Sequence, residues 1–133
     1  PKNYFRDTGL LHELLGIDDS RLLSVSPHVG ASWENYVVEE VSRAVKDRYD
    51  CFFYRTHQGT ECDMLLVQGL APKISIEIKF SSAPKLPKGF IQAIEDLGTK
   101  ENYVIAPDQS DFLLRSDIKV MSIYSFLAQI NER

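Results

Sequence analysis

Residues 61–80 constrain the fold most strongly, because two apolar segments flank a short turn there. The apolar side chains of this stretch are Met64, Leu65, Leu66, Val67, Ile74, Ile76 and Ile78. Such a pattern is typical of two buried strands of a sheet. Yet Asp63, Glu77 and Lys79 stand among these residues, where an ordinary core strand would carry Val or Ile. A buried charge costs free energy unless it is paired, so these three charges are candidates for a functional site.

The second apolar segment alternates regularly from residue 74 to residue 81. Ile74, Ile76, Ile78 and Phe80 share one face of the predicted strand, and Ser75, Glu77, Lys79 and Ser81 share the other. In an antiparallel hairpin with a turn at residues 68–73, Asp63 falls opposite Glu77, give or take one residue. The sequence therefore predicts that two carboxylates face each other on adjacent strands.

A second misplaced carboxylate lies on the clearest predicted helix, residues 32–48, for which Ser32 is the expected N-cap. At about 100° per residue, one apolar stripe of this helix is made of Val37, Val38, Val41 and Val45. Glu34 projects onto the centre of that stripe. Burial of an unpaired carboxylate there would be costly, so we expect Glu34 to have a partner.

The remaining elements alternate between strands and helices. The predicted order is a helix at 32–48, strands at 51–56, 60–67 and 74–80, a helix at 89–98, strands at 102–106 and 118–124, and a helix at 125–132. We expect residues 107–117 to be mainly loop, with an extended segment around residues 112–114. The first three strands can form a meander, and the helix at 89–98 can cross over to a parallel fourth strand. This predicts an α/β fold with a small mixed sheet (αβββαβ) flanked by helices, with Trp33 and the aromatic run at 52–54 in its core.

Composition restricts the functional classes. The chain has 133 residues and a net charge of −4, which argues against non-specific binding of nucleic acid over the whole surface. No apolar run approaches a membrane span, no signal peptide opens the chain, and no phosphate-binding GxxxxGK[ST] motif is present. Cys51 and Cys62 fit no metal-binding spacing. We therefore expect a cytoplasmic protein, without a nucleotide site in this chain. The absence of an initiator Met suggests a piece of a longer protein.

The three charges on the predicted hairpin suit a divalent cation. Facing carboxylates repel each other, and a Mg²⁺ site uses one or two carboxylates, a backbone carbonyl and waters. Asp63 and Glu77 would supply the carboxylates and Ile78 the carbonyl. Lys79, on the same face as Glu77, would hold or polarise an attacking water. Glu34 would complete the site or bind a second metal ion.

These residues carry a family resemblance. Asp63, followed after a turn by Glu77-Ile78-Lys79 and preceded by a helical glutamate, resembles the PD-(D/E)XK (restriction-endonuclease-like) nuclease superfamily. Residues 2–11, 33–41, 54–66 and 76–81 also resemble the C-terminal domain of unknown function of prokaryotic AAA-type ATPases. The residue before Asp63 departs from the superfamily pattern, since Cys62 replaces the Pro.

This resemblance implies a restriction-endonuclease-like core and a domain organisation. Residues 31–133 would form the nuclease-like domain. Residues 1–30 would form a strand, a helix and a loop that connect to an ATPase region missing from this sequence. The catalytic residues implied are Glu34, Asp63, Glu77 and Lys79, with Mg²⁺ or Mn²⁺ held by Asp63, Glu77, the Ile78 carbonyl and Glu34.

Each candidate has a simpler explanation. Asp63 can be a surface charge near a turn, Glu77 and Lys79 a solvated strand face, and Glu34 the ion-pair partner of Arg55 or Lys79. Glu61 shares the face of Asp63 and can assist it. Three further candidates are Lys85, Lys88 and Gln92. Each can contact nucleic acid or can simply be a solvated position. Two functions follow, a Mg²⁺-dependent phosphodiesterase acting on DNA, or an inactive nuclease-fold module that binds DNA or a protein partner beside the ATPase.

Overall fold

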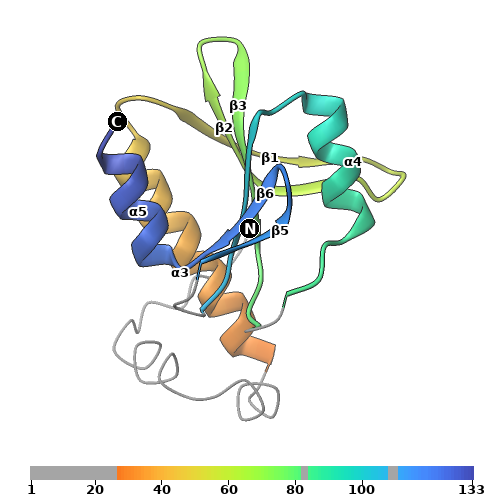
Figure 1. The fold of residues 1–133 in the computed structure, drawn as a ribbon, viewed down its shortest axis with the longest axis horizontal. Coiled ribbons are helices and arrows are strands. Elements are labelled where there is room, and N and C mark those ends of the chain that lie inside the picture. Colours follow the sequence, from red (N-terminus) through yellow and green to blue (C-terminus); the bar gives the residue numbers. More distant parts are fainter. Residues whose placement is uncertain (1–26, 82–83, 108–110) are drawn as a thin grey trace.

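The computed structural model describes residues 27–81, 84–107 and 111–133, and Figure 1 shows their arrangement. The strand and helix predicted within residues 1–26 lie outside this range. The elements are α3 (Pro27–Val45), β1 (Asp50–Arg55), β2 (Glu61–Gln68), β3 (Ala71–Ile78), α4 (Lys88–Leu97), β4 (Glu101–Ile105), β5 (Phe112–Arg115), β6 (Ile118–Met121) and α5 (Ile123–Asn131).

The described strands form one mixed sheet of six strands in the order β1-β2-β3-β4-β6-β5. β1, β2 and β3 form an antiparallel meander. α4 then connects β3 to a parallel β4, as predicted from the helix between the two strands. β6 continues the parallel pairing and β5 closes the edge in antiparallel orientation. The predicted α/β class with a mixed sheet is thus confirmed.

Helices cover both faces of the sheet (Figure 1). α3 and α5 pack side by side on one face, over a cluster that contains Val41, Ile76 and Phe126. α4 packs on the other face, over a cluster that contains Phe90 and Val104. β3 lies between these layers, and its last five residues are all buried. Glu77, near the end of β3, therefore stands in the interior, although the sequence pattern allowed a solvated strand face there.

α3 begins earlier than the sequence indicated. The described helix already includes Pro27, so Ser32 lies inside it and is not its N-cap. The segment expected to be loop up to residue 30 is therefore helical from residue 27, and the proposed boundary at residues 30 and 31 falls within α3. No helix in the described part of the chain is long and apolar enough to cross a membrane.

Two further boundaries differ from the prediction. The β2–β3 turn is only Gly69 and Leu70, since Gln68 already pairs with Ala71. Gly69 has a φ of 66°, a left-handed conformation that suits glycine, and an irregularity in the pairing next to Pro72 lets the strand continue through a proline. Within residues 107–117, expected to be mainly loop, β5 forms a full edge strand.

The aromatic residues divide between core and surface. Trp33 is 1% exposed, as predicted for a core residue. Phe52 and Phe53 were also expected in the core, and this prediction is wrong, because their side chains are 55% and 75% exposed. The physical reason is the position of β1 at the edge of the sheet, where β2 is its single neighbour among the described strands.

Candidate metal centre at the β2–β3 opening

β2 and β3 separate at the position of the candidate carboxylates. Their pairing runs from the turn up to Met64 opposite Ile76. β3 and β4 remain paired two residues further, up to Ile78 opposite Ile105. One more step of the β2–β3 register would place Asp63 opposite Glu77, so the two carboxylates stand where the sheet opens.

The carboxylate of Asp63 bridges this opening. The Ile78 N–H donates a 2.9 Å hydrogen bond to Asp63 Oδ2. The next amide, Lys79 N–H, donates to the Ile105 carbonyl of β4, so alternation along the strand directs Ile78 N–H toward β2. Asp63 thus satisfies an amide that the separating strands would leave unpaired. Strand geometry would direct the Ile78 carbonyl to the same side as its N–H, and its role as a metal ligand stays a prediction.

A β-bulge sets the direction of Asp63. Phe52 pairs with Leu65 and Tyr54 with Cys62, so Asp63 and Met64 together oppose the single residue Phe53. Cys62 and Leu65 pack on the α4 side of the sheet, whereas Met64 packs on the α3 side. An extra residue of this kind shifts the alternation of a strand and re-aims a side chain. Here it turns Asp63 toward the α3 side.

Glu77 is the most unusual charge of the site. It is 4% exposed, and its Oε1 has no hydrogen-bond partner among the described residues. Its Oε2 lies 3.4 Å from Lys79 Nζ, and the Lys79 side chain reaches solvent. Burial and then the negative charge of Asp63 raise the pKa of Glu77 to about 8, while Lys79 opposes this shift. The folded protein therefore favours the protonated form of this carboxyl, and a bound divalent cation would favour its deprotonation.

Glu34 joins Asp63 in one pocket of about 720 Å³ on the α3 side of the β1–β2 edge. The pocket is lined by Glu34, Val38, Ser42, Cys51, Phe52, Phe53, Tyr54, Arg55, Glu61, Cys62, Asp63 and Met64. The predicted proximity of Glu34 to Asp63 agrees with this lining, which does not include Glu77 or Lys79.

The three acids do not form one compact ligand set. Among residues 27–81, 84–107 and 111–133, no three His, Cys, Asp or Glu side chains gather closely enough to hold a metal ion. The physical reason lies in the sheet. Ile76 and Ile78 pack on the α3 side, so alternation turns Glu77 toward α4, whereas Glu34 projects from α3. The two glutamates thus approach Asp63 from opposite faces, and a ligand role for Glu34 stays a prediction.

Asp63 and Glu77 nevertheless suit a hard divalent cation. The two carboxyls are adjacent, and their negative charges repel each other. One oxygen of Glu77 is buried and has no hydrogen-bond partner in the described structure. A Mg²⁺ ion needs only one or two protein carboxylates, because waters complete its octahedral shell. The residues present therefore fit a two-carboxylate site.

Comparison with known proteins identifies the family. A family model described as "Domain of unknown function (DUF4143)" matches residues 29–126, most of the chain. The chain belongs to this family. Relatives include an uncharacterized protein of Mycobacterium tuberculosis and another of Mycobacterium bovis, each 36% identical over 118 residues, or 89% of this chain. The chain spans only 26% of the length of these relatives. No solved structure matches it.

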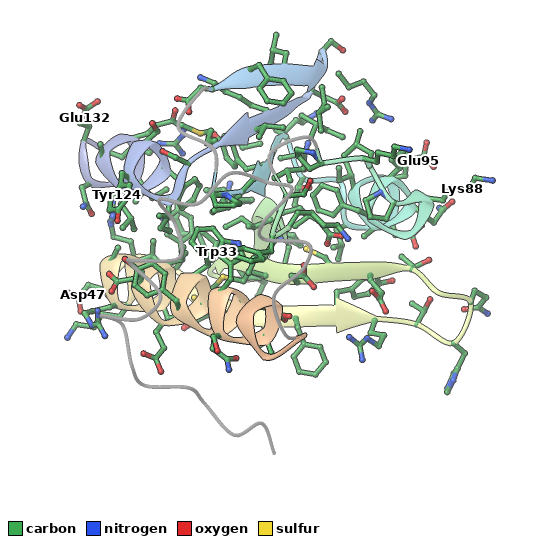
Figure 2. All side chains as sticks on the ribbon, turned by 90° about the horizontal axis from the view of Figure 1, so that it is seen from below. Trp33, Asp47, Lys88, Glu95, Tyr124 and Glu132 are labelled. Carbon is green, nitrogen blue, oxygen red and sulfur yellow. The ribbon has the colours of Figure 1, made fainter. Side chains whose placement is uncertain are left out.

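The remaining predicted residues of this DUF4143 domain lie away from Asp63. Lys88 and Gln92 line a second pocket of about 520 Å³ between α4 and the β1–β2 turn. Gln92 donates to Asp96, and Lys85 is exposed. Figure 2 shows Lys88 on α4, well separated from Trp33, which lies between α3 and the sheet. Contacts of Lys85, Lys88 and Gln92 with nucleic acid stay predictions. Glu61 forms an ion pair with Arg55 at 3.3 Å, on the rim of the Asp63 pocket.

Sequence reasoning missed two supporting residues. The Trp33 indole N–H donates a 3.0 Å hydrogen bond to the Lys79 carbonyl, and Trp33 is the neighbour of Glu34 on α3. The only indication of this role in the sequence was the position of Trp33 next to Glu34. Cys62, noted only as a departure from the motif, is buried, and its Sγ donates to the Met64 carbonyl at 2.9 Å. Burial raises the pKa of the Cys62 thiol to about 11, which favours the protonated thiol and suits a structural role at the bulge.

Proposed function

We propose that this DUF4143 domain is a nuclease-like module that hydrolyses phosphodiester bonds in DNA with Mg²⁺ or Mn²⁺. The observation that carries the proposal is the buried Glu77 carboxyl beside Asp63, with Lys79 Nζ at 3.4 Å from its Oε2. A chain that needed only a stable sheet would place an apolar residue there, since an uncompensated buried carboxyl destabilises the fold. The meander followed by a crossover to parallel β4 further supports a restriction-endonuclease-like core.

Each residue has a distinct role in this proposal. Asp63, Glu77 and the Ile78 carbonyl would hold the divalent cation. When bound, the cation would stabilise negative charge on a phosphate oxygen and lower the pKa of water. Lys79 reaches solvent from its contact with Glu77, so its ammonium can orient a water and neutralise phosphate charge at the mouth of the site. Glu34 would act from the α3 side, through the pocket that it shares with Asp63.

One observation favours a second function, an inactive nuclease-fold module that binds DNA or a protein partner. The Glu77–Lys79 ion pair partly compensates the buried carboxyl without a metal ion. A buried pair of this kind can be retained for structure alone. In either case, an AAA-type ATPase region elsewhere in the longer protein is part of the proposal. The relatives are long enough for it, since the matched region is only 26% of their length.

DNA cleavage tests the proposal. Plasmid and single-stranded DNA are incubated with the protein and Mg²⁺ or Mn²⁺. Asp63→Ala and Glu77→Ala should abolish both cleavage and metal binding, whereas Lys79→Ala should abolish cleavage and leave metal binding largely in place. Lys73→Ala is the matched control, because Lys73 lies exposed on the same strand, beyond the buried segment. Absence of cleavage together with retained DNA binding would favour the inactive module. Cleavage that survives Asp63→Ala would indicate a contaminant.

A further inference from the structure

The edge strand β1 presents an exposed aromatic side chain, Phe53, on the wall of the pocket that contains Asp63. Phe53 is 75% exposed and lies directly opposite the bulge at Asp63 and Met64, so it is a cross-strand neighbour of Asp63. Phe52 pairs with Leu65, and alternation turns its side chain toward the α4 side. An exposed phenylalanine contributes little to folding, since the hydrophobic effect stabilises only buried area.

The charges around this surface restrict what it can bind. Glu34 and Asp63 line the same pocket, so a phosphate that enters it without a cation is repelled. A neutral aromatic ring meets no such repulsion. Arg55 also lines the pocket, and its guanidinium is largely exposed beside Glu61, where it can contact a strand backbone that passes outside. The arrangement therefore suits a ligand with flat uncharged faces and a negatively charged backbone.

We infer that Phe53 stacks on an unpaired nucleobase, and that the substrate of this site is a single strand or a frayed duplex end. This inference rests on the proposed function, because it names the substrate class of the same site. Aromatic side chains bind single strands by stacking on base faces, and this contact tolerates any base sequence. Bases within a duplex are already stacked on each other and offer no free face to a protein ring.

Oligonucleotide binding in EDTA tests the inference apart from cleavage, because EDTA removes the divalent cations. The probe is a fluorescein-labelled oligothymidine of about 12 nucleotides, followed by fluorescence anisotropy, with a duplex of equal length for comparison. The single strand should bind more tightly than the duplex. Phe53→Ala should weaken its binding by about 5- to 150-fold, as loss of stacking on one base does. Phe112→Ala on the opposite edge strand β5 is the matched control and should leave binding unchanged.

Two further measurements separate stacking from general loss of binding. An oligonucleotide of abasic residues should bind weakly to the wild type, and Phe53→Ala should weaken it no further. The slope of log affinity against log salt should stay the same in Phe53→Ala, because a stacking contact releases no counterions. A smaller salt slope in Phe53→Ala, or an equal loss of affinity for the abasic and the normal strand in this variant, would overturn the inference.

The outcomes also distinguish this inference from the proposed function. Stacking-dependent binding without cleavage would sustain the inference and remove the phosphodiesterase proposal. Cleavage unaffected by Phe53→Ala, with equal affinity for single strand and duplex, would do the reverse. Dimerisation that depends on protein concentration and is lost in Phe53→Ala would assign this surface to a second copy of the chain, and would overturn the inference.

Discussion

The indole N–H of Trp33 donates a 3.0 Å hydrogen bond to the backbone carbonyl of Lys79. This contact joins α3 to the residue that follows β3, 46 positions later in the chain. The Trp33 ring also packs against Phe80, with centroids 6.0 Å apart. α3 therefore holds the end of the Glu77-Ile78-Lys79 segment in place through the residue next to Glu34.

Replacement of Trp33 by Phe should test this connection. The ring stack against Phe80 can persist, but the Lys79 carbonyl loses its donor, which should cost about 1–3 kcal/mol of unfolding free energy. Loss of part of the indole volume adds to this cost. Urea denaturation of the two proteins measures the difference. Leu113→Ala, at an exposed position on β5, is the control. Equal stability of Trp33→Phe and the wild type would show that the hydrogen bond contributes nothing.

The pH dependence of stability should reveal Glu77. Its pKa is raised from an ordinary 4.5 to about 8 in the folded state, so the folded protein keeps a proton that the unfolded chain releases. Between these two pH values the unfolded state binds fewer protons, and stability falls as pH rises. Thermal unfolding in EDTA from about pH 5 to pH 8 should show a declining melting temperature. Glu77→Gln should flatten this decline.

Glu101 provides a control of opposite sign. Its pKa is lowered, first by the hydrogen bond from Arg133, so its contribution to stability is present above the unfolded-state value and is lost as pH falls. Glu101→Gln should therefore lower stability at neutral pH, converge with the wild type at low pH, and flatten the pH dependence on the acid side only. A Glu77→Gln protein with the same profile as the wild type from about pH 5 to pH 8 would mean that Glu77 is not protonated in the folded state.

The sequence predicted the sheet because its signals there are local. Clean alternation over Ile74, Ile76 and Ile78 placed β3, and a helix between two strands predicted the parallel crossover. The order of elements from α3 to β4 followed from these signals alone. Edge strands were harder. The exposure of Phe52 and Phe53 depends on β1 having a single neighbour among the described strands, which composition does not reveal.

The candidate site was predictable in its residues but not in its geometry. Asp63 and Glu77 could be predicted as site residues because each carboxylate stands among apolar residues in the sequence. The face that each occupies depends on the bulge opposite Phe53 and on the separation of β2 from β3, and neither feature has a pattern in the sequence. For the same reason the sequence placed Glu34, Asp63 and Glu77 in one pocket, whereas only Glu34 and Asp63 line it.

Gly89 fixes α4 against the β1–β2 turn. A β-carbon at this position would overlap the carbonyl oxygen of Gly59 and crowd the Glu61 amide. Gly89→Ala should therefore force α4 away from the turn and destabilise the protein by about 1–3 kcal/mol. Gly30→Ala is the matched control, since a β-carbon at Gly30, inside α3, meets nothing within 4 Å of the described atoms. That change should stabilise the protein by up to about 1 kcal/mol. Chemical denaturation of both variants measures the contrast, and destabilisation by both would contradict the explanation.

Divalent cations should stabilise the folded protein through Asp63 and Glu77. One buried oxygen of Glu77 lacks a hydrogen-bond partner among the described residues. A divalent cation that binds this oxygen binds the folded state only, so its binding adds to folding stability by mass action. At a Mn²⁺ concentration 100 times the dissociation constant, the gain is about 2.7 kcal/mol. Thermal melts at pH 8, with millimolar Mn²⁺ or with EDTA, measure it. Asp63→Asn should lose most of the gain, because the amide keeps an oxygen that can accept from Ile78 N–H but removes the ligand charge. Glu95→Gln, an exposed acid on α4, should keep the full gain. A melting temperature that Mn²⁺ raises equally in the wild type and in Asp63→Asn would place the metal elsewhere, and no shift in either would remove the metal centre from the proposal.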